Sequence, residues 1–288
     1  EALKFIRRQV AAGKPFLTVV WFGNPHTPHE ALPADKAPYS SLPEKDQNYY
    51  GEITAIDRNV GKLRTALREL KVADQTILWY CSDNGGDAGP KSTGNLRGSK
   101  GTLWDGGLRV PGLVEWPARI PRPAVSDIPC STLDIYPTIL AATGTKAEKQ
   151  IQPLDGINLL PLFDGQMTAR GRAIPFIARL GQDNAHAALI DWPYKLHLNA
   201  NFGRGKKGAS QPAAPVLLFD LAKDPYETTD LAAQQPDRVT QMTAGLEAWR
   251  TSALRSLAGA DYGPGVTIAP AGRPKEVDGK TKRKNRAP

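Results

Sequence analysis

The chain has 288 residues, 40% of them hydrophobic and 23% charged, which fits a globular protein with one large domain or a large and a small one. No apolar run approaches the ~18 residues needed to span a membrane, and the first residues lack the long apolar core of a signal peptide. The two cysteines, Cys81 and Cys130, are too few for a disulfide framework, and neither lies in a CxxC pair of the kind that binds zinc.

The net charge of +8 is concentrated near the C-terminus. Residues 273–286 contain seven Lys or Arg and two Asp or Glu, with almost no apolar side chains. Such a composition cannot build a core, so we predict a disordered, solvated tail over 259–288. The alternative is a tail that contacts a polyanion. The rest of the chain carries little net charge, and we predict no specific nucleic-acid partner.

The first part of the chain predicts two helices and two strands in alternation. Apolar residues at helical spacing over 2–12 indicate a helix that ends at Gly13-Lys14-Pro15. The apolar, β-branched run 16–22 is typical of a buried strand. A long amphipathic helix is predicted over 50–70 and a second buried strand over 76–81. Two strands joined by a helix predict a right-handed parallel crossover.

In sheets of this kind the functional loops lie beyond the carboxyl ends of the strands. Two unusual loops fall there in this sequence. Residues 23–29 hold two prolines and two histidines, and residues 82–86 have the sequence Ser-Asp-Asn-Gly-Gly. The following segment, 86–107, is polar and glycine-rich, and long ordered loops of this kind are often functional.

The later part of the chain predicts a different unit. A third apolar run over 110–116 and a helix over 134–143, ended by Gly144, precede it. A small, mostly antiparallel sheet is then predicted from four short strands at 174–178, 187–190, 194–198 and 216–220. A helix follows over 238–257, with Asp237 as its N-terminal cap.

Asp83 and Asn84 place a carboxylate beside a carboxamide at the end of a predicted strand. Hard oxygen donors of this kind suit calcium or magnesium. Gly85 and Gly86 let the backbone turn sharply behind them. The alternative is an Asx turn without a ligand, because Asp-Asn-Gly-Gly is also a good turn sequence.

Three further side chains have the chemistry to meet an anion. His26 and His29 lie close together in the proline-rich loop, and an imidazole can donate a proton or bind an oxyanion. Lys100 lies between glycines, although the phosphate-loop pattern GxxxxGK[ST] is not matched. The alternatives are a pair of surface histidines and a solvated loop lysine.

The order and spacing of these segments together resemble the sulfatase family. In the first part, the resemblance rests on Pro25-His26-Thr27-Pro28-His29, Ser82-Asp83-Asn84-Gly85-Gly86, Arg97-Gly98-Ser99-Lys100-Gly101, Asp105-Gly106-Gly107-Leu108-Arg109-Val110-Pro111 and Asp134-Ile135-Tyr136-Pro137-Thr138. In the second part it rests on Leu218-Phe219-Asp220-Leu221, Asp224-Pro225, Glu227 and Asp230-Leu231-Ala232. It covers about residues 1–258, with Asp105 standing where many members have Glu.

The resemblance implies an α/β protein of the alkaline-phosphatase-like fold, with a mixed or parallel sheet sandwiched by helices. On this basis we expect the C-terminal part of that domain over 1–168. A smaller C-terminal subdomain, made of an antiparallel sheet and a helix, is expected over 169–258, before the tail at 259–288.

The resemblance also implies a chemistry. Sulfatases hydrolyse sulfate esters with one calcium ion and a formylglycine made from Cys or Ser in a Cys/Ser-x-Pro-x-Arg motif. Carried over by motif, Asp83 and Asn84 would be metal ligands. Lys100 and His26 would bind the sulfate and take part in catalysis. A divalent ion, a lysine and an imidazole suit the negative charge that builds on the sulfate oxygens.

The remaining implications are coarser. Asp105 and Arg109 would support the loop that carries the lysine, and His29 receives no direct role. The implied substrate is a sulfate ester, with a sulfated carbohydrate as the family's common case. Relatives are mostly exported, so we expect a periplasmic or secreted protein.

The family's nucleophile motif and its first pair of calcium-binding aspartates lie upstream of the matched region. Cys81-Ser82-Asp83 and Cys130-Ser131-Thr132 lack the Pro and the Arg, and Ser41-Leu42-Pro43-Glu44-Lys45 ends in Lys. We therefore expect the nucleophile to come from a segment outside this sequence, and residues 1–288 alone to be inactive on sulfate esters.

Two alternatives stay open. One is a related phospho- or phosphonoester hydrolase, although many such relatives hold two transition metals with more histidines than the four present here. The other is a truncated sulfatase-like protein without activity. The joint presence of His26, Asp83, Asn84 and Lys100 speaks against it, because an inactive protein has no physical need for all four.

Overall fold

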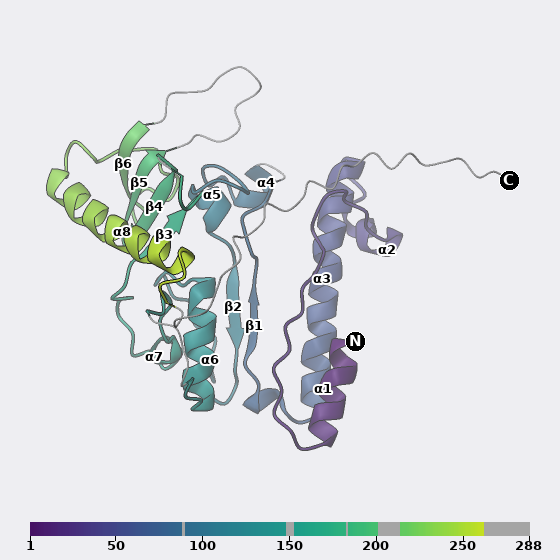
Figure 1. Cartoon of the computed structure of the whole chain (residues 1–288). Helices are drawn as coiled ribbons and strands as arrows, with labels where there is room; N and C mark the ends of the chain where they lie inside the picture. The colour runs from purple at the N-terminus through teal and green to yellow at the C-terminus, as the bar shows by residue number, and fades with distance from the viewer. Residues whose placement is uncertain (88–89, 148–152, 183, 201–213, 262–288) are drawn as a thin grey trace, which may run out of the picture. The chain divides into compact units, whose positions relative to one another are not determined.

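The computed structural model describes residues 1–87, 90–147, 153–182, 184–200 and 214–261 (Figure 1). These residues group into two compact units. The first consists of Glu1–Ser82 and Pro111–Asp127, and the second consists of Asp83–Val110 and the residues from Ile128 onward. The domain boundaries at 168 and 258 stay a prediction. Most of the predicted tail, from residue 262, lies outside the described residues.

The first unit is mainly helical. Its elements are α1 (Ala2–Ala11), α2 (Pro33–Lys36), η1 (Ala37–Tyr39), α3 (Glu44–Glu69), η2 (Ala73–Gln75), β1 (Leu78–Cys81) and β2 (Gly112–Glu115). The helices predicted over 2–12 and 50–70 are confirmed as α1 and α3. Helix α3 starts earlier than predicted, directly after Pro43, with the acidic side chains of Glu44 and Asp46 in its first turn. Negative charge there is favoured by the helix dipole.

Helix α3 is joined to its surroundings by two ion pairs. At its middle, Arg58 binds the buried carboxylate of Asp35 on α2. Nearer its end, Arg64 Nε donates to Glu115 Oε2 of β2 at 2.5 Å, and this hydrogen bond lowers the pKa of the Glu115 carboxyl. The Arg64–Glu115 ion pair therefore holds α3 beside β2 within the first unit.

The predicted parallel crossover is wrong for the described structure. Strand β1 pairs with β2 and runs antiparallel to it, with Leu78 opposite Glu115 and Cys81 opposite Gly112. Residues 16–22 form no strand, and Leu17 and Trp21 are 68% and 90% exposed. A strand needs a neighbour for its backbone hydrogen bonds, and no strand in the described ranges pairs with this run. Cys81, expected to be buried, is half-buried.

The second unit holds the predicted antiparallel sheet. Its elements are α4 (Pro90–Thr93), α5 (Asp105–Leu108), η3 (Thr132–Asp134), α6 (Ile135–Thr143), α7 (Leu160–Phe163), β3 (Ile174–Ile177), β4 (Ala187–Asp191), β5 (Tyr194–Ala200), β6 (Ala214–Asp220) and α8 (Pro236–Leu257). All four predicted strands are confirmed. So is the end of α6 at Gly144, which has the left-handed φ of 64° that glycine tolerates.

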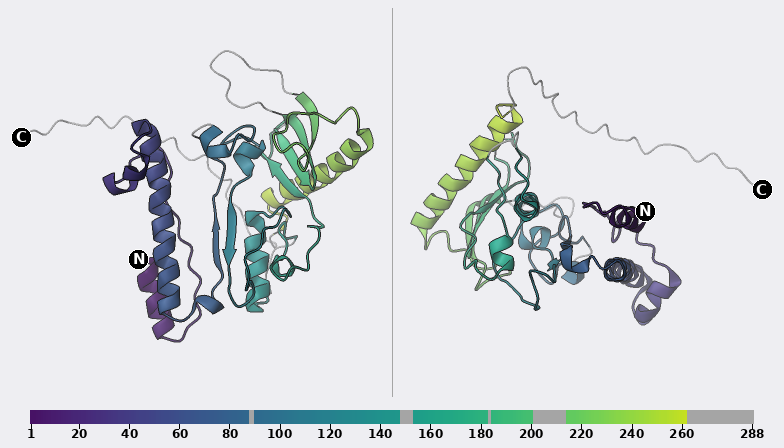
Figure 2. Two further views of the ribbon diagram at one scale, coloured as in Figure 1. Left: turned by 180° about the vertical axis from the view of Figure 1, so that it is seen from behind. Right: turned by 90° about the horizontal axis from the view of Figure 1, so that it is seen from below.

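The four strands pair antiparallel in the order β3-β4-β5-β6, and α8 lies across one face of this sheet (Figures 1 and 2). The predicted cap of α8 is wrong. Gln235 occupies the cap position, and Asp237 lies inside the first turn because the helix already begins at Pro236. Proline suits that position, since the first helical N–H groups have no partner within the helix.

Alternation along β6 separates two cores, with Leu218 in one and Phe219 in the other. Leu196 packs with Leu218 of β6 and with Met242 and Leu246 of α8. On the opposite face of the sheet, Phe219 packs with other buried side chains, namely Trp104, Ala200 and Leu221. Successive side chains of a strand point to opposite faces, so one strand serves both cores. In the described part of the chain, no helix combines the length and the apolar content needed to cross a membrane.

Candidate active site

Asp83 and Asn84 follow β1 after a single residue, Ser82, and begin the second unit. Asp83 is exposed and Asn84 half-buried, and Asn84 Nδ2 donates to Asp83 Oδ1 at 2.9 Å. The two side chains thus present a carboxylate and a carboxamide from one turn. No cluster of three or more His, Cys, Asp or Glu suited to a metal occurs among the described residues. The role of the pair as metal ligands stays a prediction.

Glycine packing holds the turn of Asp83 and Asn84 against the segment that contains α5. Gly85 N donates to Gly107 O at 2.9 Å. A Cβ on Gly85 would lie 1.9 Å from Gly106 O, a distance that real Cβ atoms do not reach. Only a residue without a side chain allows this approach, so the glycines noted in the sequence serve contact between backbones.

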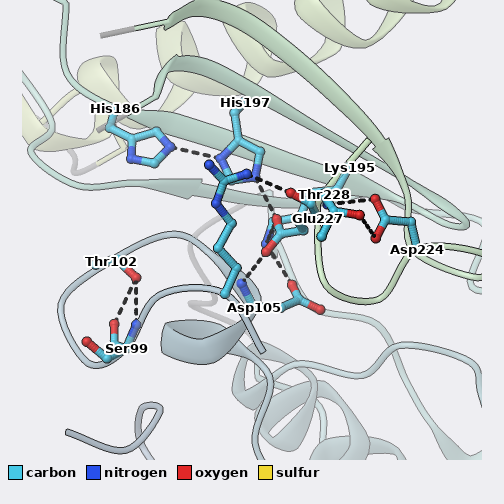
Figure 3. Close-up of polar contacts among 10 residues, drawn as sticks. Ser99, Thr102, Asp105, His186, Lys195, His197, Asp224, Glu227 and Thr228 are labelled. Atoms are coloured by element: carbon cyan, nitrogen blue, oxygen red, sulfur yellow. Dashed lines mark hydrogen bonds and ion pairs between the residues drawn. The ribbon is translucent and has the colours of Figure 1, made fainter. Parts of the chain in front are cut away.

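Lys100 lies at the exposed tip of a loop that closes on itself. At the base of the loop, Gly106 N donates to Arg97 O at 2.7 Å. At its tip, Thr102 Oγ1 donates to Ser99 O at 2.8 Å and accepts from Ser99 N at 3.2 Å (Figure 3). We refer to residues 97–106 as the Lys100 loop. Its internal bonds restrict the positions that the lysine can take.

The Lys100 loop is also bonded to the turn that carries the metal-ligand candidates. Lys100 N donates to Gly86 O at 3.0 Å. The structure therefore brings together three of the four predicted site residues, Asp83, Asn84 and Lys100, on two backbone segments of the second unit.

The fourth predicted residue, His26, belongs to the first unit, and its participation stays a prediction. His26 is exposed, with Nδ1 2.8 Å from Thr27 O. Because a carbonyl only accepts, Nδ1 carries the proton and Nε2 is the atom left to face a ligand. His29 is buried and lies 2.9 Å from Glu52 Oε2 of α3, whose other oxygen accepts from Glu30 N at 3.0 Å. His29 thus anchors the loop that presents His26.

A buried polar network adjoins the Lys100 loop, and sequence reasoning did not identify it as a unit (Figure 3). Lys195 Nζ on β5 lies 2.6 Å from Asp105 Oδ1 and 2.9 Å from Glu227 Oε1. Glu227 Oε1 also lies 2.9 Å from His197 Nε2, and His197 Nδ1 lies 2.8 Å from His186 Nε2. Asp105, expected to support the loop, is only 3% exposed and belongs to this network.

Both histidines of the network are held neutral. Burial, with His197 and Lys195 acting in the same direction, lowers the pKa of His186 to about 3. Burial likewise lowers the pKa of His197 well below its ordinary value. Since the Glu227 carboxylate only accepts, His197 donates from Nε2 and accepts at Nδ1 from His186. Each ring is thereby fixed in one tautomer.

Stacked planar groups complete the contact between loop and sheet. The Trp104 ring stacks on His197 with ring centroids 4.4 Å apart, and the Arg97 guanidinium lies 3.8 Å from the Trp104 ring centroid. Burial lowers the pKa of Arg97 from its usual value, opposed by Glu227 and Asp224. Arg109, the other expected support of the loop, is exposed.

One sequence signal pointed to this network. Lys195 and His197 alternate with apolar residues along β5, a pattern that places both on one face of the sheet. Sequence alone could not show that this face is covered. In the structure Lys195 and His197 are both 0% exposed.

Comparisons with known proteins show which family this chain resembles. A family profile described as Sulfatase matches residues 1–145. The chain is 36% identical to the N-acetylgalactosamine-6-sulfatase of Canis lupus familiaris, over 81% of this chain and 47% of that protein. It is 30% identical to the steryl-sulfatase of Mus musculus, over 86% of this chain and 42% of that protein. The chain thus spans about half the length of the curated relatives it matches.

Solved structures show the same likeness. Ps i-CgsB in complex with k-i-k-neocarrahexaose matches with a TM-score of 0.76 at 30% identity, over 86% of this chain and 53% of that one. Solved relatives include sulfatases of the alkaline-phosphatase-like fold, and the mixture of helices and antiparallel sheets fits it. The fold class predicted from the sequence is therefore confirmed.

Proposed function

Because this chain belongs to the sulfatase family, we propose that it is the part of a sulfuric ester hydrolase that binds the metal and the sulfate group. The observation that carries the proposal is the backbone connection between two segments. The hydrogen bond from Lys100 N to Gly86 O places a cationic loop beside the Asp83–Asn84 turn. A metal and a lysine side by side suit an anion with several oxygens, such as sulfate.

The donor set fits a calcium ion. Calcium takes about 6–8 oxygen ligands, and Asp83 and Asn84 offer hard oxygens from adjacent positions. Zinc prefers sulfur and imidazole, which this turn does not contain. A calcium ion held here would act as a Lewis acid toward the sulfate and neutralise part of its charge. The remaining ligands would come from outside the described residues, in line with the absence of a larger acidic cluster.

Lys100 and His26 have separate tasks in this proposal. The Lys100 ammonium donates hydrogen bonds to a sulfate oxygen and stabilises the negative charge that grows there as the ester bond breaks. His26 has Nδ1 bound to Thr27 O, so Nε2 is the nitrogen left to bind a ligand. When protonated, that nitrogen donates to a sulfate oxygen or to the departing alkoxide.

The nucleophile is proposed to be a formylglycine from a segment outside residues 1–288. None of the serines and cysteines in the sequence is followed by Pro and Arg at the required spacing. The formylglycine, where present, supplies the oxygen that attacks sulfur. This chain's own groups bind and orient the sulfate.

The proposed substrate is a sulfated carbohydrate, acted on in the periplasm or outside the cell. One relative is named an N-acetylgalactosamine-6-sulfatase, and one solved relative binds k-i-k-neocarrahexaose. Both names point to a sugar as the alcohol part of the ester.

The test uses two preparations. One is residues 1–288 alone, and the other is the chain together with a segment whose Cys/Ser-x-Pro-x-Arg motif has matured to formylglycine. We expect only the second to hydrolyse an aryl sulfate, and a calcium chelator to abolish the activity. Lys100→Ala should lower kcat/KM by about 100-fold or more, as loss of an oxyanion-stabilising donor does.

The matched control is Lys62→Ala, which removes an exposed lysine from the surface of α3 and should leave kcat/KM unchanged. Full activity of the Lys100→Ala variant would reject the assigned role of the lysine. Hydrolysis by residues 1–288 alone would reject the external nucleophile.

A further inference from the structure

A single carboxylate, Glu227, bridges the four-stranded sheet and the Lys100 loop (Figure 3). Its Oε1 accepts from Lys195 Nζ and His197 Nε2 on β5, each at 2.9 Å. Its Oε2 accepts from Asp105 N at one end of the loop at 2.7 Å. Its backbone oxygen accepts from Arg97 Nη1 at the other end, at 2.6 Å. One residue thus holds both ends of the loop.

We propose that Glu227 is a positioning residue for Lys100, acting through Arg97 and Asp105; this inference rests on the proposed function. The two ends that Glu227 holds are also joined to each other by the bond from Gly106 N to Arg97 O. Because hydrogen bonds to Glu227 hold both ends of the Lys100 loop, the position of Lys100 is restricted. Without those bonds, the exposed lysine can move relative to Asp83 and Asn84.

The backbone of Glu227 supports a positioning role. Its φ is +55°, in the left-handed region that residues other than glycine rarely adopt. The preceding Asp224 holds this conformation, because its Oδ2 accepts from Thr228 N at 2.7 Å and from Thr229 N at 2.8 Å. Strained backbone persists where the surroundings fix it, and it clusters at functional sites.

Because Glu227 is buried, its hydrogen bonds depend on the carboxylate itself and not only on the volume of the side chain. Glu227 and Lys195 are both 0% exposed, so water cannot replace a lost partner. All the groups that the carboxylate meets are donors: an ammonium, an imidazole N–H and a backbone N–H. A glutamine at position 227 would turn its NH₂ group toward a donor in either orientation of the amide. Glu227→Gln therefore breaks at least one side of the carboxylate bridge with almost no change in volume, and it leaves the bond from Arg97 to the backbone oxygen in place.

The first experiment measures hydrogen exchange of the chain itself and needs no activity. In Glu227→Gln we expect faster amide exchange over residues 97–107, with exchange in β5 unchanged. The control is Asp220→Asn, a buried carboxylate on β6 that accepts from Ala222 N and Lys223 N at 3.2 and 3.3 Å. It should leave exchange of the Lys100 loop unchanged. Unchanged exchange of the loop in Glu227→Gln would overturn the inference.

The second experiment uses the polypeptide that also carries the nucleophile segment. Glu227→Gln should lower kcat/KM by about 100-fold, the effect of misplacing a group by about 1 Å. In a Lys100→Ala background the same change should cost little more, because a positioning residue acts only through the residue it positions. If Glu227→Gln lowers kcat/KM by the same factor in the Lys100→Ala background as alone, Glu227 has a general structural role and the inference is overturned. The proposed function is tested without any change at Glu227, by the Lys100→Ala variant and by the two preparations, so its failure is distinguishable from failure of this inference.

Discussion

Neutral histidines in a buried charged network give the protein a dependence on pH that can be traced to single residues. His186 is 6% exposed, and burial lowers its pKa to about 3. An unfolded chain returns the imidazole to its ordinary pKa of about 6.5. Between these two values the unfolded chain binds a proton that the folded chain does not. The free energy of unfolding must therefore fall as the pH falls from about 6.5 toward 3.

We predict that His186→Gln makes this fall less steep. Glutamine keeps an N–H group that can donate to His197 Nδ1 but does not titrate. Urea denaturation at a series of pH values should show a slope between pH 4 and 6 reduced by up to ~1.4 kcal/mol per pH unit, the contribution of one proton. At pH 8 the histidines are neutral in both the folded and the unfolded chain. The difference in the free energy of unfolding between the variant and the unchanged protein then reports only the altered hydrogen bond. Equal slopes below pH 6.5 would contradict the assignment.

At the scale of elements, helix α3 fixes the loop of His26 through a buried carboxylate. Glu52 is 4% exposed, and its two oxygens meet His29 Nδ1 and Glu30 N. The loop itself has no regular structure, and these bonds connect it to a rigid element. The proline-rich sequence indicated a loop. Nothing in it indicated that His29 points inward while His26 stays exposed.

Glu52→Ala should therefore loosen this loop and destabilise the first unit. It leaves two donors without their acceptor, at a cost of about 1–3 kcal/mol in the free energy of unfolding. Denaturant titration measures the loss, and hydrogen exchange over residues 26–31 should become faster. Glu69→Ala, which removes an exposed glutamate at the end of the same helix, should change neither quantity. Equal effects of the two substitutions would contradict the anchoring role.

At the scale of the whole molecule, the most unusual surface is the exposed apolar run at 17–22. Leu17, Val19 and Trp21 are 68%, 63% and 90% exposed. Contiguous apolar surface of this kind marks an interaction site or promotes aggregation. The sequence had predicted a buried strand there, and its composition still matches that environment.

We expect residues 1–288, purified alone, to self-associate through this run. Light scattering after size-exclusion chromatography should give a mass that rises with protein concentration. Val19→Lys with Trp21→Lys should reduce the association. Val125→Lys, at an isolated position that is 97% exposed, should not. A monodisperse monomer that melts cooperatively would contradict this expectation.

Local sequence patterns predicted many of the helices and strands and the candidate site residues. Hydrophobic periodicity located α1, α3, α6 and all four strands of the antiparallel sheet, because packing one face of an element leaves a regular trace in the sequence. Motif order identified the sulfatase family and the candidates Asp83, Asn84, Lys100 and His26, because each of those residues lies within a short characteristic stretch of sequence. Their roles remain predictions for the experiments above.

Tertiary structure decided what depends on distant partners. The pairing of β1 with β2 brings together residues more than thirty positions apart along the chain, and no local pattern specifies such a partner. Glu227 lies 122 positions from Asp105, whose backbone it holds. Whether a charged side chain on a strand faces water or a buried partner depends on what covers that face. The sequence by itself thus determined the family and most of the helices and strands, and only the folded chain determined strand pairing and which charges are buried together.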